Sequence, residues 1–114
     1  MAKPLTSKRY QVDDFIAAQD LFFKNGWTDG MPVVPPTANR VTEFLEYAGI
    51  EPGQVIGEIP ERAKVITAEK LAINAVMAGC LPEYMPVLVA TIEAMTEPRF
   101  KFNHLASMGS PWPI

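Results

Sequence analysis

The chain has 114 residues, the usual size of one small domain, and its 48% hydrophobic and 20% charged residues are an ordinary globular composition, which excludes disorder as the default state. The formal net charge is −3, and no basic patch occurs beyond Lys8 and Arg9. Nucleic-acid binders neutralise phosphates with clustered Lys and Arg, so this chain is not expected to bind nucleic acid.

The sequence favours a cytoplasmic location. Cys80 is the single cysteine, so it has no partner for an internal disulfide. The N-terminus lacks the apolar segment of a signal peptide. The longest apolar run, residues 71–95, is interrupted by glycine, glutamate and two prolines, so we expect no membrane span and no membrane partner.

The first predicted element is a helix over residues 12–25, ended by Gly26. Asp13 and Asp14 fall in its first turn, where the helix dipole favours carboxylates. Four large side chains are expected on one apolar face: Phe15, Ile16, Leu21 and Phe22.

A second helix is predicted from the N-cap Thr37 to Gly49, with an apolar side made of Val41, Phe44, Leu45 and Ala48. Residues 53–60 and 62–66 are expected to form two short strands. Thr67 then caps a third helix ending at Gly79. A fourth helix begins near Pro86, which suits a first-turn position, and ends at about Thr96.

These elements predict an α+β or α/β fold with about four helices and two or three short strands. Such strands are few for a self-sufficient sheet, so we expect a partner chain to complete it. The expected organisation is an N-terminal arm at residues 1–11, a single helix-rich domain at 12–98 and a C-terminal tail at 99–114 packed on a partner.

The segment "AGCLPEYMP" is the first candidate site. Cys80 follows the predicted cap Gly79 and is a candidate nucleophile, although a free cysteine is more often a small buried hydrophobic residue. Glu83 is either a general acid or base or a carboxylate that stabilises the start of the next helix. Tyr84 is a candidate hydrogen-bond donor to a substrate.

The segment "NGWTDGMPVVPPT" is the second candidate. Trp27 offers a flat apolar surface, Thr28 a hydroxyl and Asp29 a carboxylate, and Gly30 lets the backbone approach a ligand. The alternative is a plain turn, because Asp-Gly is a common turn pair and Asp29 can cap its own backbone. The pattern leaves both interpretations open.

No metal site is predicted. His104 is the sole histidine, and the acidic residues and Cys80 show no ligand spacing around it. A lone histidine is more often structural than a ligand. The sequence names no cofactor.

Three stretches in this order, "GWTDGMPVVPPT", "TAEKLAINAVMAGCLPEYMPVLVATIEAM" and "FNHLASMGS", resemble the N-terminal region of the UGSC-motif family of bacterial (seleno)proteins, described as thiol–disulfide oxidoreductase-like. The resemblance covers most of residues 26–110. It implies that Trp27–Gly30 and the matching residues Gly79, Cys80, Glu83 and Tyr84 line a common site.

Two departures limit this resemblance. The Cys-containing motif that names the family is absent, so its redox role does not transfer to this chain. The chain also ends where the family's C-terminal part begins. That predicts either an enzyme split between genes, with this chain as the small subunit, or a cut polypeptide; both predict a larger partner.

Three functions follow as hypotheses. The first is a subunit of a heteromeric bacterial enzyme that acts on a small organic molecule by redox, lyase or hydrolytic chemistry, with Cys80, Glu83 and Asp29 as catalytic candidates. The second is a non-catalytic subunit that stabilises a catalytic partner. The third is a stand-alone small-molecule binding domain.

Overall fold

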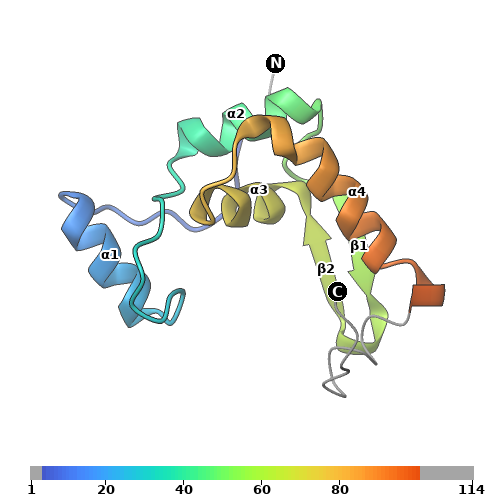
Figure 1. The fold of residues 1–114 in the computed structure, drawn as a ribbon, viewed down its shortest axis with the longest axis horizontal. Helices are drawn as coiled ribbons and strands as arrows, with labels where there is room; N and C mark the ends of the chain where they lie inside the picture. The colour runs from blue at the N-terminus through green and yellow to red at the C-terminus, as the bar shows by residue number, and fades with distance from the viewer. Residues whose placement is uncertain (1–3, 101–114) are drawn as a thin grey trace.

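A computed structural model describes residues 4–100 of the chain (Figure 1). This part is α+β, as expected, because its two-stranded sheet is antiparallel. Its helices and strands are α1 (Phe15–Lys24), α2 (Ala38–Ala48), β1 (Val55–Ile59), β2 (Lys64–Thr67), α3 (Ala68–Met77) and α4 (Met85–Met95). Three short 3-10 helices are η1 (Pro60–Arg62), η2 (Pro82–Tyr84) and η3 (Pro98–Phe100).

Threonine caps start α2 and α3 where the sequence predicts them. The N–H of Arg40 donates to the Thr37 hydroxyl at 3.3 Å, and the N–H of Lys70 donates to the Thr67 hydroxyl at 3.3 Å. Each bond satisfies a backbone donor that the first helical turn leaves without a partner. The starts of both helices are therefore determined by the sequence next to them.

Three of the four α-helices in residues 4–100 end in the same glycine cap, the Schellman motif. Gly26, Gly49 and Gly79 follow α1, α2 and α3 with φ of 73°, 68° and 84°, left-handed values that favour glycine. In each case the next residue returns its N–H to a carbonyl of the last turn: Trp27 to Phe22, Ile50 to Leu45 and Cys80 to Ala75, at 2.9–3.2 Å. An apolar residue at that position commonly packs on the last turn.

The core lies between α2, α3, α4 and β1. Its four largest fully buried side chains are Val41, Phe44, Val76 and Met85. Small residues of α3 complete the contact: Ala68, Ala72 and Ala75. Burial of one large apolar side chain stabilises the fold by about 1.5–3 kcal/mol, so this cluster holds the three helices together.

The β1–β2 hairpin extends from the core along α4 (Figure 1). Gly57 of β1 lies directly against the end of that helix: a Cβ there would lie 2.8 Å from Thr96 Cγ2 and 2.9 Å from Thr96 Cβ. Such distances are below van der Waals contact. The absence of a side chain at Gly57 therefore allows this approach of helix to strand.

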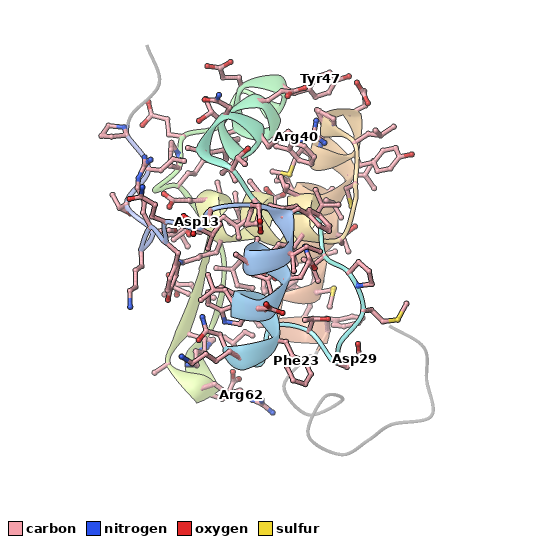
Figure 2. All side chains as sticks on the ribbon, turned by 90° about the vertical axis from the view of Figure 1, so that its left-hand side faces the viewer. Asp13, Phe23, Asp29, Arg40, Tyr47 and Arg62 are labelled. Atoms are coloured by element: carbon pink, nitrogen blue, oxygen red, sulfur yellow. The ribbon has the colours of Figure 1, made fainter. Side chains whose placement is uncertain are left out.

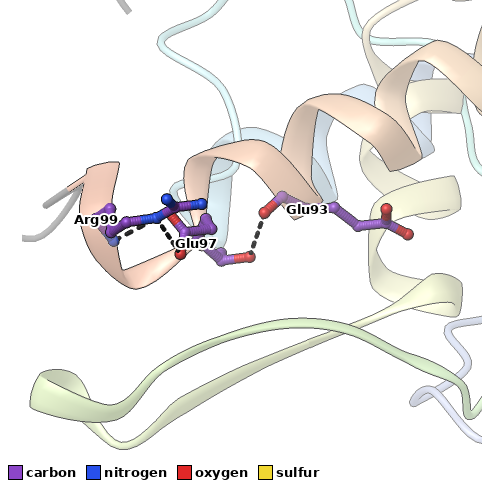
Figure 3. A network of polar contacts seen from close by, with 4 residues as sticks. Glu93, Glu97 and Arg99 are labelled. Atoms are coloured by element: carbon purple, nitrogen blue, oxygen red, sulfur yellow. Dashed lines mark hydrogen bonds and ion pairs between the residues drawn. The ribbon is translucent and has the colours of Figure 1, made fainter.

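Polar contacts close the end of α4. The Thr96 hydroxyl donates to the carbonyl of Ile92 at 2.7 Å. Beyond it, the Arg99 guanidinium pairs with the Glu97 carboxylate at 3.1 Å (Figure 3). The Arg99 side chain is 90% exposed, so this ion pair contributes little to stability.

The prediction for α1 was correct about the helix and only partly correct about its face, of which Phe22 is buried and Leu21 half-buried. The helix begins at Phe15, with Asp14 as the N-cap rather than a first-turn residue. Phe22 and Ala18 are its buried side chains, whereas Phe15 is 54% and Ile16 66% exposed. The reason is tertiary: α1 lies at one side of the core between two extended segments, and only part of its surface is covered (Figure 1).

Candidate functional site

The Trp27–Gly30 segment is a turn closed by its own side chains. The N–H of Gly30 donates to Thr28 Oγ1 at 3.2 Å, and that hydroxyl donates to the carbonyl of Met31 at 2.7 Å. The N–H of Met31 donates to Asp29 Oδ1 at 3.2 Å. Gly30 has φ of 119°, which favours glycine. The hydroxyl and one carboxylate oxygen therefore stabilise the turn itself.

Gln19 holds the loop that follows against α1. Its side-chain amide donates to the carbonyl of Val33 at 2.7 Å, and its oxygen accepts from the N–H of Val33 at 2.8 Å. A side-chain amide paired twice with one backbone residue replaces the bonds that a strand partner would make. These two bonds hold the loop against α1 just beyond the turn.

Trp27 packs on the last turn of α1, the helix that precedes it. Its ring lies 6.0 Å from Phe22, centroid to centroid, and meets Tyr10 edge-on at 5.4 Å. This is the apolar contact of the glycine cap at the end of α1. The indole is nevertheless 45% exposed, so one side of it is open to a ligand or a protein.

Gly79 and Cys80 form the corresponding cap at the end of α3. The N–H of Gly79 donates to Val76 and that of Cys80 to Ala75, both at 3.0 Å. The half-buried Cys80 packs against the core cluster. Cys80 therefore has the same structural position as Trp27 and Ile50, which accounts for a small apolar residue here without any chemistry.

Glu83 and Tyr84 are the open groups of this corner. They lie in η2, directly before α4, and both side chains are exposed, Tyr84 by 50%. Within residues 4–100, no hydrogen bond or ion pair occupies the Glu83 carboxylate. A carboxylate and a phenol hydroxyl next to a helix N-terminus are suited to proton transfer or to binding a polar ligand.

The two candidate segments meet through Val34. Its N–H donates to the carbonyl of Met77 at 3.3 Å, and its Cγ2 lies 4.0 Å from the position of a Cβ on Gly79. The Trp27–Gly30 turn itself lies beyond the far end of α1, away from the end of α3 (Figure 1). The structure thus brings the loop to the corner, but Asp29 and Cys80 do not form one cluster.

Glu69 is a polar residue that the sequence did not single out. The residue is 3% exposed, and its carboxylate accepts from the N–H groups of Thr6 at 3.0 Å and Ser7 at 2.7 Å. Burial raises the pKa of this carboxyl. The hydrogen bonds from Ser7 and Thr6, together with the charge of Lys70, lower it by more, so the pKa lies below its usual value.

Glu69 therefore anchors the N-terminal segment to α3. The only available signal was its position, since Glu69, Ala72 and Val76 share one helix face and the latter two are buried. A carboxylate on the buried face of a helix requires hydrogen-bond donors, and the donors of Glu69 are remote in sequence.

Among residues 4–100, no three His, Cys, Asp or Glu side chains come together in a way that could hold a metal ion. His104 lies outside the described residues. Within the described part, no helix has the length and apolar composition needed to cross a membrane.

Comparisons with protein-family models, curated proteins and solved structures find no match for this chain. The proposals below rest on its own residues.

Proposed function

We propose that this protein is the small subunit of a heteromeric enzyme that acts on a small organic molecule. The observation that carries the proposal is the amount of apolar surface that is exposed to solvent. Fifteen large hydrophobic side chains in residues 4–100 are exposed, and they include Phe15, Ile16, Phe23 and Val87 at 54–67%. Single exposed apolar residues are normal, whereas groups of them mark interaction sites.

Helix α4 supports the same proposal. Glu93 is its only charged residue, yet Met85 is its only fully buried side chain. Leu88, Val89 and Ile92 pack against the core, whereas Val87 on the outer side is 67% exposed beside few polar residues. The two-stranded sheet is likewise smaller than an independently stable sheet.

The proposed contribution to the shared active site is the Glu83–Tyr84 corner, with the Trp27–Gly30 turn as a second element. Glu83 has an unoccupied carboxylate at the start of α4, and Tyr84 adds an exposed hydroxyl beside it. Both segments belong to the stretches that resemble the UGSC-motif family. A partner that covers the corner would exclude water from it, and the electrostatic interactions of these polar groups with a substrate would then be stronger.

The second candidate is a non-catalytic subunit that stabilises a catalytic partner. It is favoured by the structural use of two proposed catalytic residues. Asp29 caps its own turn, and Cys80 packs in the cap of α3. The two candidates differ in Glu83, whose carboxylate has no hydrogen-bond or ion-pair partner within the described residues.

The test starts from the assembly purified from its source through a tag on this chain. Incubation with a small-molecule extract of the same cells, followed by mass spectrometry, identifies the compound consumed. The mass change distinguishes loss of two hydrogens, addition of water and loss of a fragment. The Glu83→Gln assembly is then compared with Glu46→Gln, an exposed glutamate of α2.

A loss of turnover in Glu83→Gln of about a hundredfold, with Glu46→Gln unchanged, supports a catalytic role. Unchanged turnover in both variants, together with full activity of the isolated partner, contradicts it and favours the stabilising subunit.

A further inference from the structure

The open side of α1 is an apolar surface without cover. It is formed by four side chains that we call the α1 face: Phe15, Ile16, Phe23 and Met31. Their exposed fractions are 54%, 66%, 62% and 68%. The Phe23 ring lies 3.9 Å from the position of a Cβ on Gly30, the residue before Met31.

Aspartates surround this face. Asp20 lies four residues after Ile16 and three before Phe23, so helix geometry places its carboxylate beside both. Figure 2 shows Phe23 next to Asp29 at one end of α1 and Asp13 at the other. The only basic residue of α1 is Lys24, in the last turn, where it complements the helix C-terminus.

This charge is local. Residues 10–31 contain four aspartates and one lysine, and the remainder of the chain contains nine acidic and nine basic residues. The segment that carries the α1 face is therefore acidic, and the basic residues directly before it are Arg9 and Lys8, which lies over the Tyr10 ring. An apolar centre with an acidic rim selects a partner with the opposite rim.

We propose that the α1 face docks on an apolar surface rimmed by Lys and Arg on the larger subunit, an inference that rests on the function proposed above. A second copy of this chain is a poor occupant. In a two-fold contact the same patch faces itself, so the aspartate rims of the two copies would repel each other.

The experiment uses the assembly purified from its source and measures the dissociation constant of the tagged chain from its partner. Ile16→Arg places a like charge against the partner's basic rim, and Asp20→Lys reverses one rim charge. The control is Glu46→Lys on α2, which makes the same charge change as Asp20→Lys at an exposed glutamate outside the proposed contact. Because these side chains are exposed, the thermal unfolding of each variant chain is expected to match that of the unmodified chain.

The expected result is a dissociation constant raised by about tenfold or more in Ile16→Arg. Asp20→Lys is expected to raise it by about threefold or more at low salt, with a weaker dependence on salt than the unmodified chain. Glu46→Lys is expected to leave it within about twofold. Ile16→Asp, in which the new charge opposes the basic rim, should weaken binding less than Ile16→Arg.

Three results would overturn the inference: unchanged binding in Ile16→Arg, an equal loss in Glu46→Lys, or an assembly that contains only copies of this chain. The first two leave a heteromeric enzyme in place with its contact elsewhere. If instead Ile16→Arg releases the chain and the partner keeps its full activity, the result supports the docking surface and contradicts a catalytic role of this subunit.

Discussion

The N–H of Ser7 donates to the carboxylate of Glu69 at 2.7 Å, across 62 positions of sequence. Lys70 Nζ completes the contact by donating to the Ser7 hydroxyl at 3.0 Å. The N-terminal segment is thereby fixed on α3, and the lowered pKa of Glu69 makes this attachment dependent on pH.

Replacement of Glu69 by Gln should lower the free energy of unfolding by about 1–3 kcal/mol at pH 7, because a buried amide donor would face the backbone donors of Thr6 and Ser7. The folded pKa of Glu69 is depressed. Its contribution is therefore present above the unfolded pKa of about 4.3 and is lost as the pH falls through the folded value. Urea unfolding at several pH values measures both effects.

In that titration the difference between the unmodified chain and Glu69→Gln should shrink on acidification below about pH 4. A variant as stable as the unmodified chain at pH 7 would show that Glu69 does not anchor the N-terminal segment.

Gly57→Ala should destabilise the protein by about 1–3 kcal/mol through overpacking against Thr96. Removal of the Thr96 side chain beyond Cβ should restore part of this loss in the double variant Gly57→Ala, Thr96→Ala. Chemical unfolding of the two single variants and the double variant gives the coupling between the sites. Strictly additive effects would mean that strand and helix do not touch here.

Gly79→Ala tests the cap that positions Cys80. The backbone at Gly79 has φ of 84°, so an alanine there should cost about 1–2 kcal/mol although the nearest neighbour, a Val34 methyl, would be 4.0 Å away. Gly53→Ala is the control, since Gly53 has neither a positive φ nor a neighbour within 4 Å. Equal melting temperatures for the two variants would speak against the left-handed cap.

Cys80→Ala should leave the turnover of the native assembly unchanged and lower the stability of the chain by about 1 kcal/mol or less, because the thiol is a half-buried packing group. Cys80→Ser serves as a second probe that keeps the size and removes the thiol. Loss of turnover in both variants, with folding intact, would make Cys80 catalytic and refute the structural interpretation.

Helices α2 and α3 could be predicted because their signals are local. Thr37 and Thr67 start them, and Gly49 and Gly79 end them, through bonds that span five positions or fewer. The turn at Asp29 is local in the same way, because the N–H of Met31 donates to the Asp29 side chain two positions away.

The covered side of α1 could not be predicted, because burial depends on what lies beside a helix. Phe15 and Ile16 belong to the apolar pattern of α1, yet they remain exposed where the core does not reach them. Glu69 escaped prediction for a related reason: its hydrogen-bond partners, Thr6 and Ser7, are remote in sequence. The candidate site residues were chosen from the sequence. The sequence did not indicate that Asp29 lies in a turn after α1 while Cys80 lies in the cap of α3.

The measurement that tests the central claim most directly is the mass of the native assembly from its source, intact and then denatured. The account predicts a larger second chain in fixed ratio to this 12.6 kDa chain, with the uncovered surfaces of α1 and α4 available for that contact. A folded, monomeric 12.6 kDa species alone would contradict it, and a stand-alone binding domain would then be the better account.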